Sequence, residues 1–154
     1  MAKYLMIFFI AMLPIVELRG AIPYASIMDV EFLPALAVAV LGNMFPVPFI
    51  LLLFRYMLKW FSNFPVIGPM LTKVLARAEK KAESIGKYEL LGVYIFVAIP
   101  LPGTGAWTGS LVANVLKLPV RKAMVAILLG VLTSGLIMSV LSYLLPDLFV
   151  ALFM

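Results

Sequence analysis

The sequence predicts an all-helical integral membrane protein, and three observations carry that prediction. Of the 154 residues, 65% are hydrophobic, a share that excludes an ordinary soluble domain and leaves length for a single membrane domain over residues 1–154. Apolar runs long enough to cross a bilayer alternate with apolar runs of about half that length. Proline, glycine and charged residues interrupt several of these runs in the middle, where they disfavour a continuous helix.

The first apolar region, residues 4–28, is interrupted by Pro14 and by the segment Glu-Leu-Arg-Gly-Ala-Ile-Pro at 17–23. Each half is too short to cross about 30 Å of hydrocarbon as a helix. We therefore expect a re-entrant hairpin over 4–28, with a single kinked span as the alternative. A cleaved secretory signal is disfavoured, because no small-residue cleavage site followed by a polar chain comes next.

Residues 32–54 are long enough for a full span, and they carry Asn43 at membrane depth. An amide there either hydrogen-bonds between helices or faces a cavity, and both interpretations of Asn43 stay open. Residues 55–89 hold most of the charge. Within them, residues 70–88 repeat apolar side chains at three- and four-residue spacing opposite a basic face, which predicts an amphipathic helix on the membrane surface.

The second half of the chain repeats the plan of the first. Residues 90–116 form another half-length pair, broken at 100–109 by Pro-Leu-Pro-Gly-Thr-Gly-Ala-Trp-Thr-Gly, and residues 123–145 form a second full span. Gly20-Ala21 matches Gly105-Ala106, and Leu33-Pro34 matches Leu118-Pro119, in one register. The sequence therefore predicts two inverted repeats, each a re-entrant hairpin followed by a transmembrane helix.

The lysines and arginines favour two re-entrant hairpins over four full spans. If both hairpins return to the side from which they enter, the basic segments 55–89 and 117–122 share one side, which the positive-inside rule makes cytoplasmic in a multi-pass cell-membrane protein. Four full spans would put these segments on opposite sides. A basic rim facing anionic lipid then accounts for the net charge of +5, and no soluble domain remains to bind nucleic acid.

The two deep charges, Glu17 and Arg19, are the first candidates for function. Glu17 is a candidate for proton coupling and Arg19 for binding an anion, with a structural ion pair at the hairpin tip as the alternative. Residues two apart point away from each other on a helix, so a mutual pair requires the helix to break between them. The other candidates for substrate binding are Gly20, Pro23, Asn43, Pro100, Pro102, Gly103, Thr104, Gly105 and Trp107.

The segment 103–105 offers backbone amides and the Thr104 hydroxyl to an anionic headgroup, or else it serves close hairpin packing. The chain contains no histidine, no cysteine and a single deep carboxylate, so we expect no metal, no cofactor and no enzymatic activity. Two full spans bury little surface. We therefore expect a homo-oligomer, a dimer, whose partners are membrane lipids, including those with anionic headgroups.

Three segments together resemble the small multidrug export protein family: 17–23, Gly42-Asn43 with Pro46, and 99–109. That family is similar to the wider DedA (VTT-domain) superfamily, and the resemblance runs from about residue 12 to residue 145. It implies inverted repeats of hairpin plus helix, and a transporter or lipid flippase that moves a small or lipid-linked anionic substrate between the two hairpin tips, with proton coupling. This chain lacks the arginines of DedA proteins around the second proline motif. A non-transporting membrane scaffold or assembly factor is the alternative function.

Overall fold

The computed structural model describes residues 1–61, 88–101 and 103–153, and the regular structure in these ranges is entirely helical. The first half contains α1 (Ala2–Met12), α2 (Glu17–Ile27), α3 (Phe32–Met44) and α4 (Val47–Phe61). The second half contains α6 (Glu89–Ala98), α7 (Ala106–Val115), α8 (Val120–Ser139), a π-helical turn (Val140–Leu144) and α9 (Pro146–Phe153). The predicted amphipathic helix at 70–88 lies, up to residue 87, outside the described residues.

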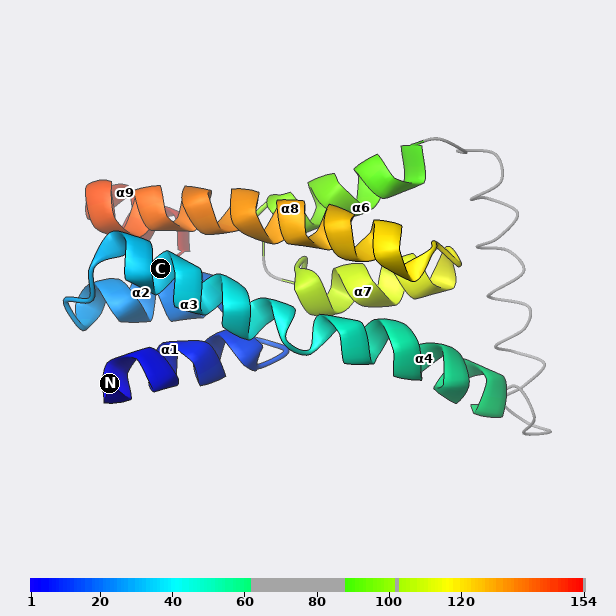
Figure 1. Cartoon of the computed structure of the whole chain (residues 1–154). Helices are drawn as coiled ribbons and strands as arrows, with labels where there is room; N and C mark the ends of the chain where they lie inside the picture. Colours follow the sequence, from blue (N-terminus) through cyan, green and yellow to red (C-terminus); the bar gives the residue numbers. More distant parts are fainter. Residues whose placement is uncertain (62–87, 102, 154) are drawn as a thin grey trace.

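Helices α1 and α2 form a hairpin and pack side by side (Figure 1). The chain leaves the helical conformation at Leu13, whose backbone is extended, and re-enters it at Glu17. This antiparallel packing excludes a single kinked span over 4–28. Helices α6 and α7 form a second hairpin of the same kind, with extended backbone at Ile99 and a loop that runs to Gly105.

Within the described ranges, two helices are long and apolar enough to cross a membrane, judged by length and composition. One is Phe32–Phe54, of 23 residues, and the other is Val120–Leu144, of 25 residues. They agree with the predicted spans at 32–54 and 123–145, although the second begins three residues earlier. The first is broken after Met44 because Pro46 and Pro48 bring no backbone N–H to the helix.

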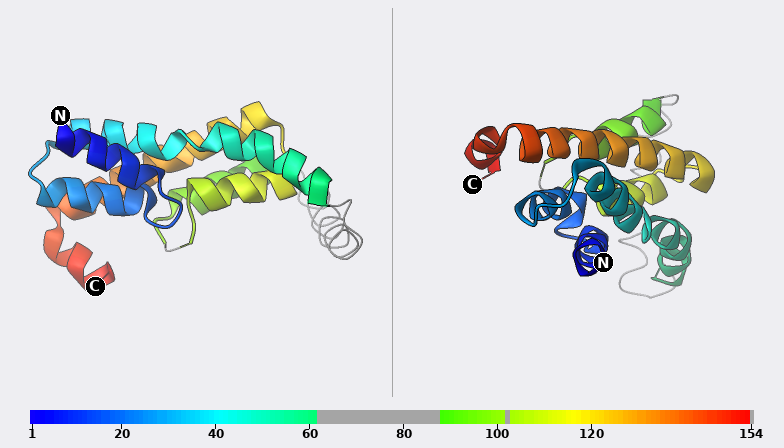
Figure 2. Two further views of the ribbon diagram at one scale, coloured as in Figure 1. Left: turned by 90° about the horizontal axis from the view of Figure 1, so that it is seen from below. Right: turned by 60° about the vertical axis from the view of Figure 1, so that its left-hand side comes forward.

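The two hairpins occupy opposite ends of an elongated molecule, and their turns meet near its middle (Figures 1 and 2). The α3–α4 unit and α8 run along the whole length in opposite directions. The N-terminus, the α2–α3 connection and the end of α8 lie at one end. The end of α4, the start of α6 and the α7–α8 connection lie at the other.

Each hairpin packs closely against the long helix that follows it, and a glycine in that long helix makes the close contact possible. A side chain at Gly42 of α3 would collide with the carbonyl of Phe8 in α1. A side chain at Gly130 of α8 would come within 2.9 Å of the carbonyl oxygen of Tyr94 in α6. Small residues let membrane helices approach this closely. The two halves of the chain therefore use the same contact.

The ends of the hairpins also match. Asp29 after α2 and Lys117 after α7 both have left-handed backbone, with φ of +52° and +53°. The next amides, at Val30 and Leu118, donate back into their helices in the same pattern. This equivalence of Val30 with Leu118 differs by three residues from the predicted match of Leu33-Pro34 with Leu118-Pro119, so the register expected from the sequence is wrong at this point.

Each hairpin also crosses to the long helix of the other half. The Ser26 hydroxyl of α2 donates to the Ser142 carbonyl, 3.0 Å away, in the π-helical turn after α8. The Asn114 side chain of α7 donates to the Ile50 carbonyl of α4 at 3.2 Å. A polar residue late in each hairpin thus binds backbone in the opposite half, and these contacts tie the two halves together.

The core combines many alanines with larger apolar side chains such as Ile7, Leu18 and Ile127. Buried alanines line the helix crossings, and large apolar side chains such as Leu33 and Ile27, both more than 70% exposed, face outward. This is the reverse of a soluble protein, which hides its large apolar residues from water. The buried alanines are Ala11, Ala21, Ala25, Ala35, Ala39, Ala98, Ala106, Ala113, Ala123 and Ala126.

Candidate functional site

Glu17 begins α2 with an unusual backbone. Its φ is +50°, in the left-handed region that L-residues other than glycine enter at a cost of roughly 1–2 kcal/mol. Its side chain is buried, and the carboxylate accepts hydrogen bonds from the amides of Trp107 at 3.1 Å and Ala106 at 3.3 Å. These amides form the N-terminus of α7, where the helix dipole favours a negative charge. Glu17 therefore caps a helix of the other hairpin.

Arg19 binds the loop that precedes the same helix. One guanidinium nitrogen donates to the carbonyl of Leu101, and the other donates to the carbonyl of Ile99 at 3.0 Å and to Thr104 Oγ1 at 2.8 Å. Both carbonyls lie just past the end of α6, where they also accept hydrogen bonds from the amides of Leu101 and Thr104, so Arg19 adds a charged donor to a loop that is already hydrogen-bonded. The hydrogen bonds of both charged side chains thus go to the second hairpin.

Two further residues of the second hairpin complete the junction. The Thr104 hydroxyl lies 2.8 Å from the Ile99 carbonyl oxygen and 2.9 Å from that of Leu101, and so it closes the loop on itself. The Trp107 indole N–H donates to the Met12 carbonyl at the end of α1 at 3.1 Å. The Thr104 hydroxyl, which was expected to bind an anionic headgroup, is therefore already hydrogen-bonded within the loop. The neighbouring amides of Ala106 and Trp107 bind the Glu17 carboxylate.

The glycines permit close approach or an unusual backbone. A side chain at Gly105 would collide with the Glu17 carboxylate, and one at Gly20 would collide with the side chain of Val16. Gly103 has φ of +81° and open space around it, so there the backbone conformation itself favours glycine. The placement of Gly105 fits the packing interpretation of the segment 103–105, and Gly20, a candidate for substrate binding, lies against Val16 of its own hairpin.

Two of the three predicted prolines lie in the described residues, and both are half-buried. Pro23 sits inside α2, half-buried, where it cannot donate to the carbonyl one turn earlier. Pro100 is half-buried in the loop directly after α6. Pro102 lies outside the described residues.

A narrow gap lies where the two hairpin tips meet the long helices. It encloses about 160 Å³ between atoms and has no room for a water-sized sphere. Side chains from both halves line it: Glu17, Leu18, Arg19, Asn43, Val97, Gly105, Ala106, Val131 and Ser134. It therefore joins the deep charges with polar groups of α3 and α8.

Three polar atoms around this gap are buried without a hydrogen-bond partner. They are Arg19 Nε, Asn43 Oδ1 and Ser134 Oγ, and the Asn43 and Ser134 side chains are each 3% exposed. A buried polar group left unpaired costs about 1–3 kcal/mol, so its presence calls for a reason such as a ligand or an ion. One donor, one acceptor and one hydroxyl that can be either are thus available to a ligand.

Ser134 is a site residue that the sequence did not reveal. In the sequence, Ser134-Gly135 is typical of close helix packing, and Gly135 does lie against Leu36 of α3. The signal was a small polar side chain in the middle of an apolar span, which by itself indicates packing as readily as chemistry. Asn43, which lines the same gap, was predicted, and both interpretations of Asn43 remain compatible with this position.

Acidic side chains do not gather around the gap in metal-binding numbers. Within the described ranges, no group of three or more histidine, cysteine, aspartate or glutamate residues could hold a metal ion. What the site can do is bind polar groups, through the unpaired atoms above and the helix end that Glu17 occupies.

Comparison with known proteins extends this description. A family model described as "Putative small multi-drug export protein" matches residues 17–137. No curated protein and no solved structure matches the chain. The matched range begins at Glu17, directly after the turn of the first hairpin, and takes in the second hairpin and every residue that lines the gap. With two helices able to cross a bilayer, this is a membrane protein, and the chain belongs to the family of putative small multi-drug export proteins.

Proposed function

We propose that this protein is a membrane export transporter whose substrate site lies between the tips of two re-entrant hairpins. The observation that carries the proposal is the set of three unpaired, buried polar atoms on Arg19, Asn43 and Ser134 around one gap. An ionisable side chain inside a membrane protein, here Arg19, is a functional-site candidate by default, and the unpaired atoms of Asn43 and Ser134 lie around the same gap. The family name, which speaks of export, supports the same function.

The lengths of the short helices support the re-entrant arrangement. Helices α1, α2, α6 and α7 have 10 or 11 residues, or roughly 15–17 Å, about half the hydrocarbon thickness. In this proposal each hairpin enters and leaves on one side, while α3–α4 and α8 cross fully. The segments 55–89 and 117–122 are then cytoplasmic.

The paired contacts support an inverted repeat. Gly42 and Gly130 meet equivalent turns of their hairpins, and the long helices that carry them run in opposite directions (Figure 1). Inverted repeats that meet at broken helices near the midplane are a recurring transporter plan. The relation to the wider DedA superfamily stays a prediction, as does the homodimer.

The chemistry of the gap suggests the substrate class. Arg19 keeps a free Nε donor, and Asn43 and Ser134 add polar atoms, so an anionic or strongly polar group of a small or lipid-linked molecule fits these partners. The gap is closed, and opening it requires the tips to separate. Protonation of Glu17 would remove the charge that the Ala106 and Trp107 amides bind, which gives proton coupling a physical route.

The test compares two serines of α8. Ser134→Ala removes a hydroxyl that makes no hydrogen bond, so stability should be unchanged or higher by about 1 kcal/mol, while transport should fall at least fivefold. Ser139→Ala, also buried and unpaired but away from the gap, is the matched control and should transport normally. Proteoliposomes would be assayed with carboxyfluorescein efflux and with dithionite reduction of NBD-phosphatidylglycerol.

The outcomes separate the two functions. Loss of transport in Ser134→Ala alone supports the site. If the wild-type protein moves neither probe, the scaffold or assembly function gains support. If Ser134→Ala and wild type transport at one rate, the assignment of the gap is wrong.

A further inference from the structure

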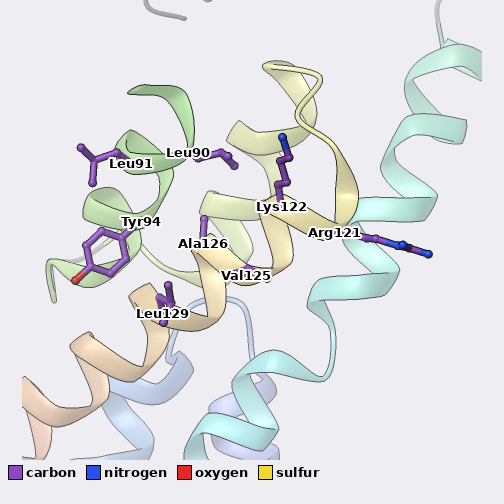
Figure 3. Close-up of a pocket in the computed structure, with 8 residues that line it drawn as sticks. All are labelled: Leu90, Leu91, Tyr94, Arg121, Lys122, Val125, Ala126 and Leu129. Atoms are coloured by element: carbon purple, nitrogen blue, oxygen red, sulfur yellow. The ribbon is translucent and has the colours of Figure 1, made fainter. Parts of the chain in front are cut away.

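A groove of about 650 Å³ lies between α6 and α8, away from the gap (Figure 3). It shares no lining residue with the gap. Its lining is apolar except for two cations at one end: Leu90, Leu91, Tyr94, Arg121, Lys122, Val125, Ala126 and Leu129. The Tyr94 hydroxyl lies 3.2 Å from Thr133 Oγ1, so its polar end is engaged and its ring completes the apolar wall.

The cations mark where this groove meets the membrane surface. Arg121 and Lys122 follow directly on Val120, the first residue of the second full-length span, and both are exposed. Val125 and Leu129 lie deeper along the same helix and are 57% and 50% exposed. A molecule in the groove therefore meets hydrocarbon-like walls along its length and positive charge at its outer end.

We propose that this groove binds one acyl chain of an anionic glycerophospholipid, with the phosphate-bearing headgroup held by Lys122. The volume of the groove lies within the range of roughly 300–1,000 Å³ that is typical of small-molecule binding pockets. Cations at a membrane surface attract anionic lipid headgroups, and apolar walls exclude the headgroup from the groove itself. The charge pattern thus fits a lipid with a negative head and an apolar tail.

The two cations have different roles in this proposal. The Lys122 side chain extends along the side of the groove where Leu90 lies, whereas the Arg121 side chain points away from α6 (Figure 3). The headgroup contact therefore belongs to Lys122. Arg121 also lines the groove, but its side chain extends away from α6 and so contributes positive potential without contacting the headgroup, which makes Arg121 the comparison for Lys122.

The experiment uses the full chain in nanodiscs with equal amounts of phosphatidylglycerol and phosphatidylcholine, followed by native mass spectrometry of the released protein. We expect wild type to retain phosphatidylglycerol in excess. Lys122→Gln should lower the ratio of retained phosphatidylglycerol to phosphatidylcholine about fivefold, as the loss of one surface cation predicts. Arg121→Gln should lower it less.

A second pair of variants tests the apolar walls. Val125→Trp fills the groove and should abolish retention of the lipid, whereas Leu136→Trp, on an exposed position of α8 outside the groove, should retain it. If Lys122→Gln and Arg121→Gln lower the ratio of retained phosphatidylglycerol to phosphatidylcholine equally, the preference for phosphatidylglycerol comes from general surface charge, and the proposal is overturned. The proposal is also overturned if Val125→Trp retains phosphatidylglycerol as wild type does, whether or not the substitution changes the oligomeric state. Transport assays do not enter this test, so its result stands apart from the export function.

Discussion

The Glu17 carboxylate occupies the place that an external anion would take at the start of α7. It accepts two backbone hydrogen bonds there while its own backbone is held in the left-handed region. Strained backbone persists where the surrounding structure demands it, and such positions cluster at functional sites. At the scale of single residues, the junction therefore depends on one side chain with the length and charge to reach α7.

Glu17→Gln should destabilise the folded protein. The neutral amide offers one oxygen to two N–H donors and turns its own NH₂ group toward them, so at least one charge-assisted hydrogen bond is lost. We expect the free energy of unfolding to fall by about 1.5–3 kcal/mol, measured by titration with SDS in mixed micelles.

Glu31→Gln is the matched control for this measurement. Glu31 is exposed, and its side chain makes no capping hydrogen bond to α3, so its change should stay within about 0.5 kcal/mol. Equal stability of Glu17→Gln and wild type would show that the two amide contacts contribute little to the folded state.

The unit at the next scale is the hairpin with the long helix that follows it. In each half a glycine of that helix touches the first helix of the hairpin, and a residue of the second helix reaches across to the other half. The short helices cannot be stable alone, because isolated helices below about 12–15 residues are marginal. Their position depends on these contacts.

The glycine contacts can be tested as a pair. Gly42→Ala and Gly130→Ala each force a methyl group against helix backbone and should destabilise the protein by about 1–3 kcal/mol. Gly92→Ala, on an open face of α6, should stabilise it by about 0.5–1 kcal/mol because alanine favours the helix. Thermal unfolding in detergent compares all three. A neutral result for Gly42→Ala or Gly130→Ala would mean that the helices separate at little cost.

The hairpin boundaries show how far the sequence alone could go. Pro14, Pro100 and the half-length apolar runs predicted a break in each short pair and both long apolar helices, since these signals are local. The segment 17–23, expected to interrupt the first run, instead lies within α2, and the break is at 13–16. The partners of Glu17 and Arg19 lie about 80–90 residues away along the chain, and no local pattern specifies them. The role of Ser134 likewise depends on how α3 and α8 meet, whereas the break after Met44 follows from the local signal of Pro46 and Pro48.

Across the whole molecule, the two ends differ in charge and in the segments they carry. The α7–α8 connection and the start of α6 share one end, and the α2–α3 connection lies at the other (Figure 1). In a bilayer these ends face opposite sides under the proposed topology, with the basic end cytoplasmic.

Single cysteines test this sidedness against four full spans, and the natural chain has no cysteine to interfere. Tyr88→Cys and Pro119→Cys, both at exposed positions, should react with an impermeant maleimide only from the cytoplasmic side, and Glu31→Cys only from the outside. Right-side-out vesicles expose the outer face of the membrane to the maleimide, and inverted vesicles expose the cytoplasmic face. Labelling of Tyr88→Cys and Pro119→Cys from opposite sides would mean that the second hairpin crosses the membrane.

The junction between the two hairpins has a consequence for biosynthesis. Glu17 and Met12 leave the ribosome well before Ala106 and Trp107, the residues that they bind. Until those partners are made, a carboxylate, a guanidinium and a free helix end have no place in hydrocarbon, and water or the insertion machinery must hold them. If the hairpin is re-entrant as proposed, we expect it to reach its final depth only after translation has passed residue 107, so that insertion of this small protein does not simply follow the order of its sequence.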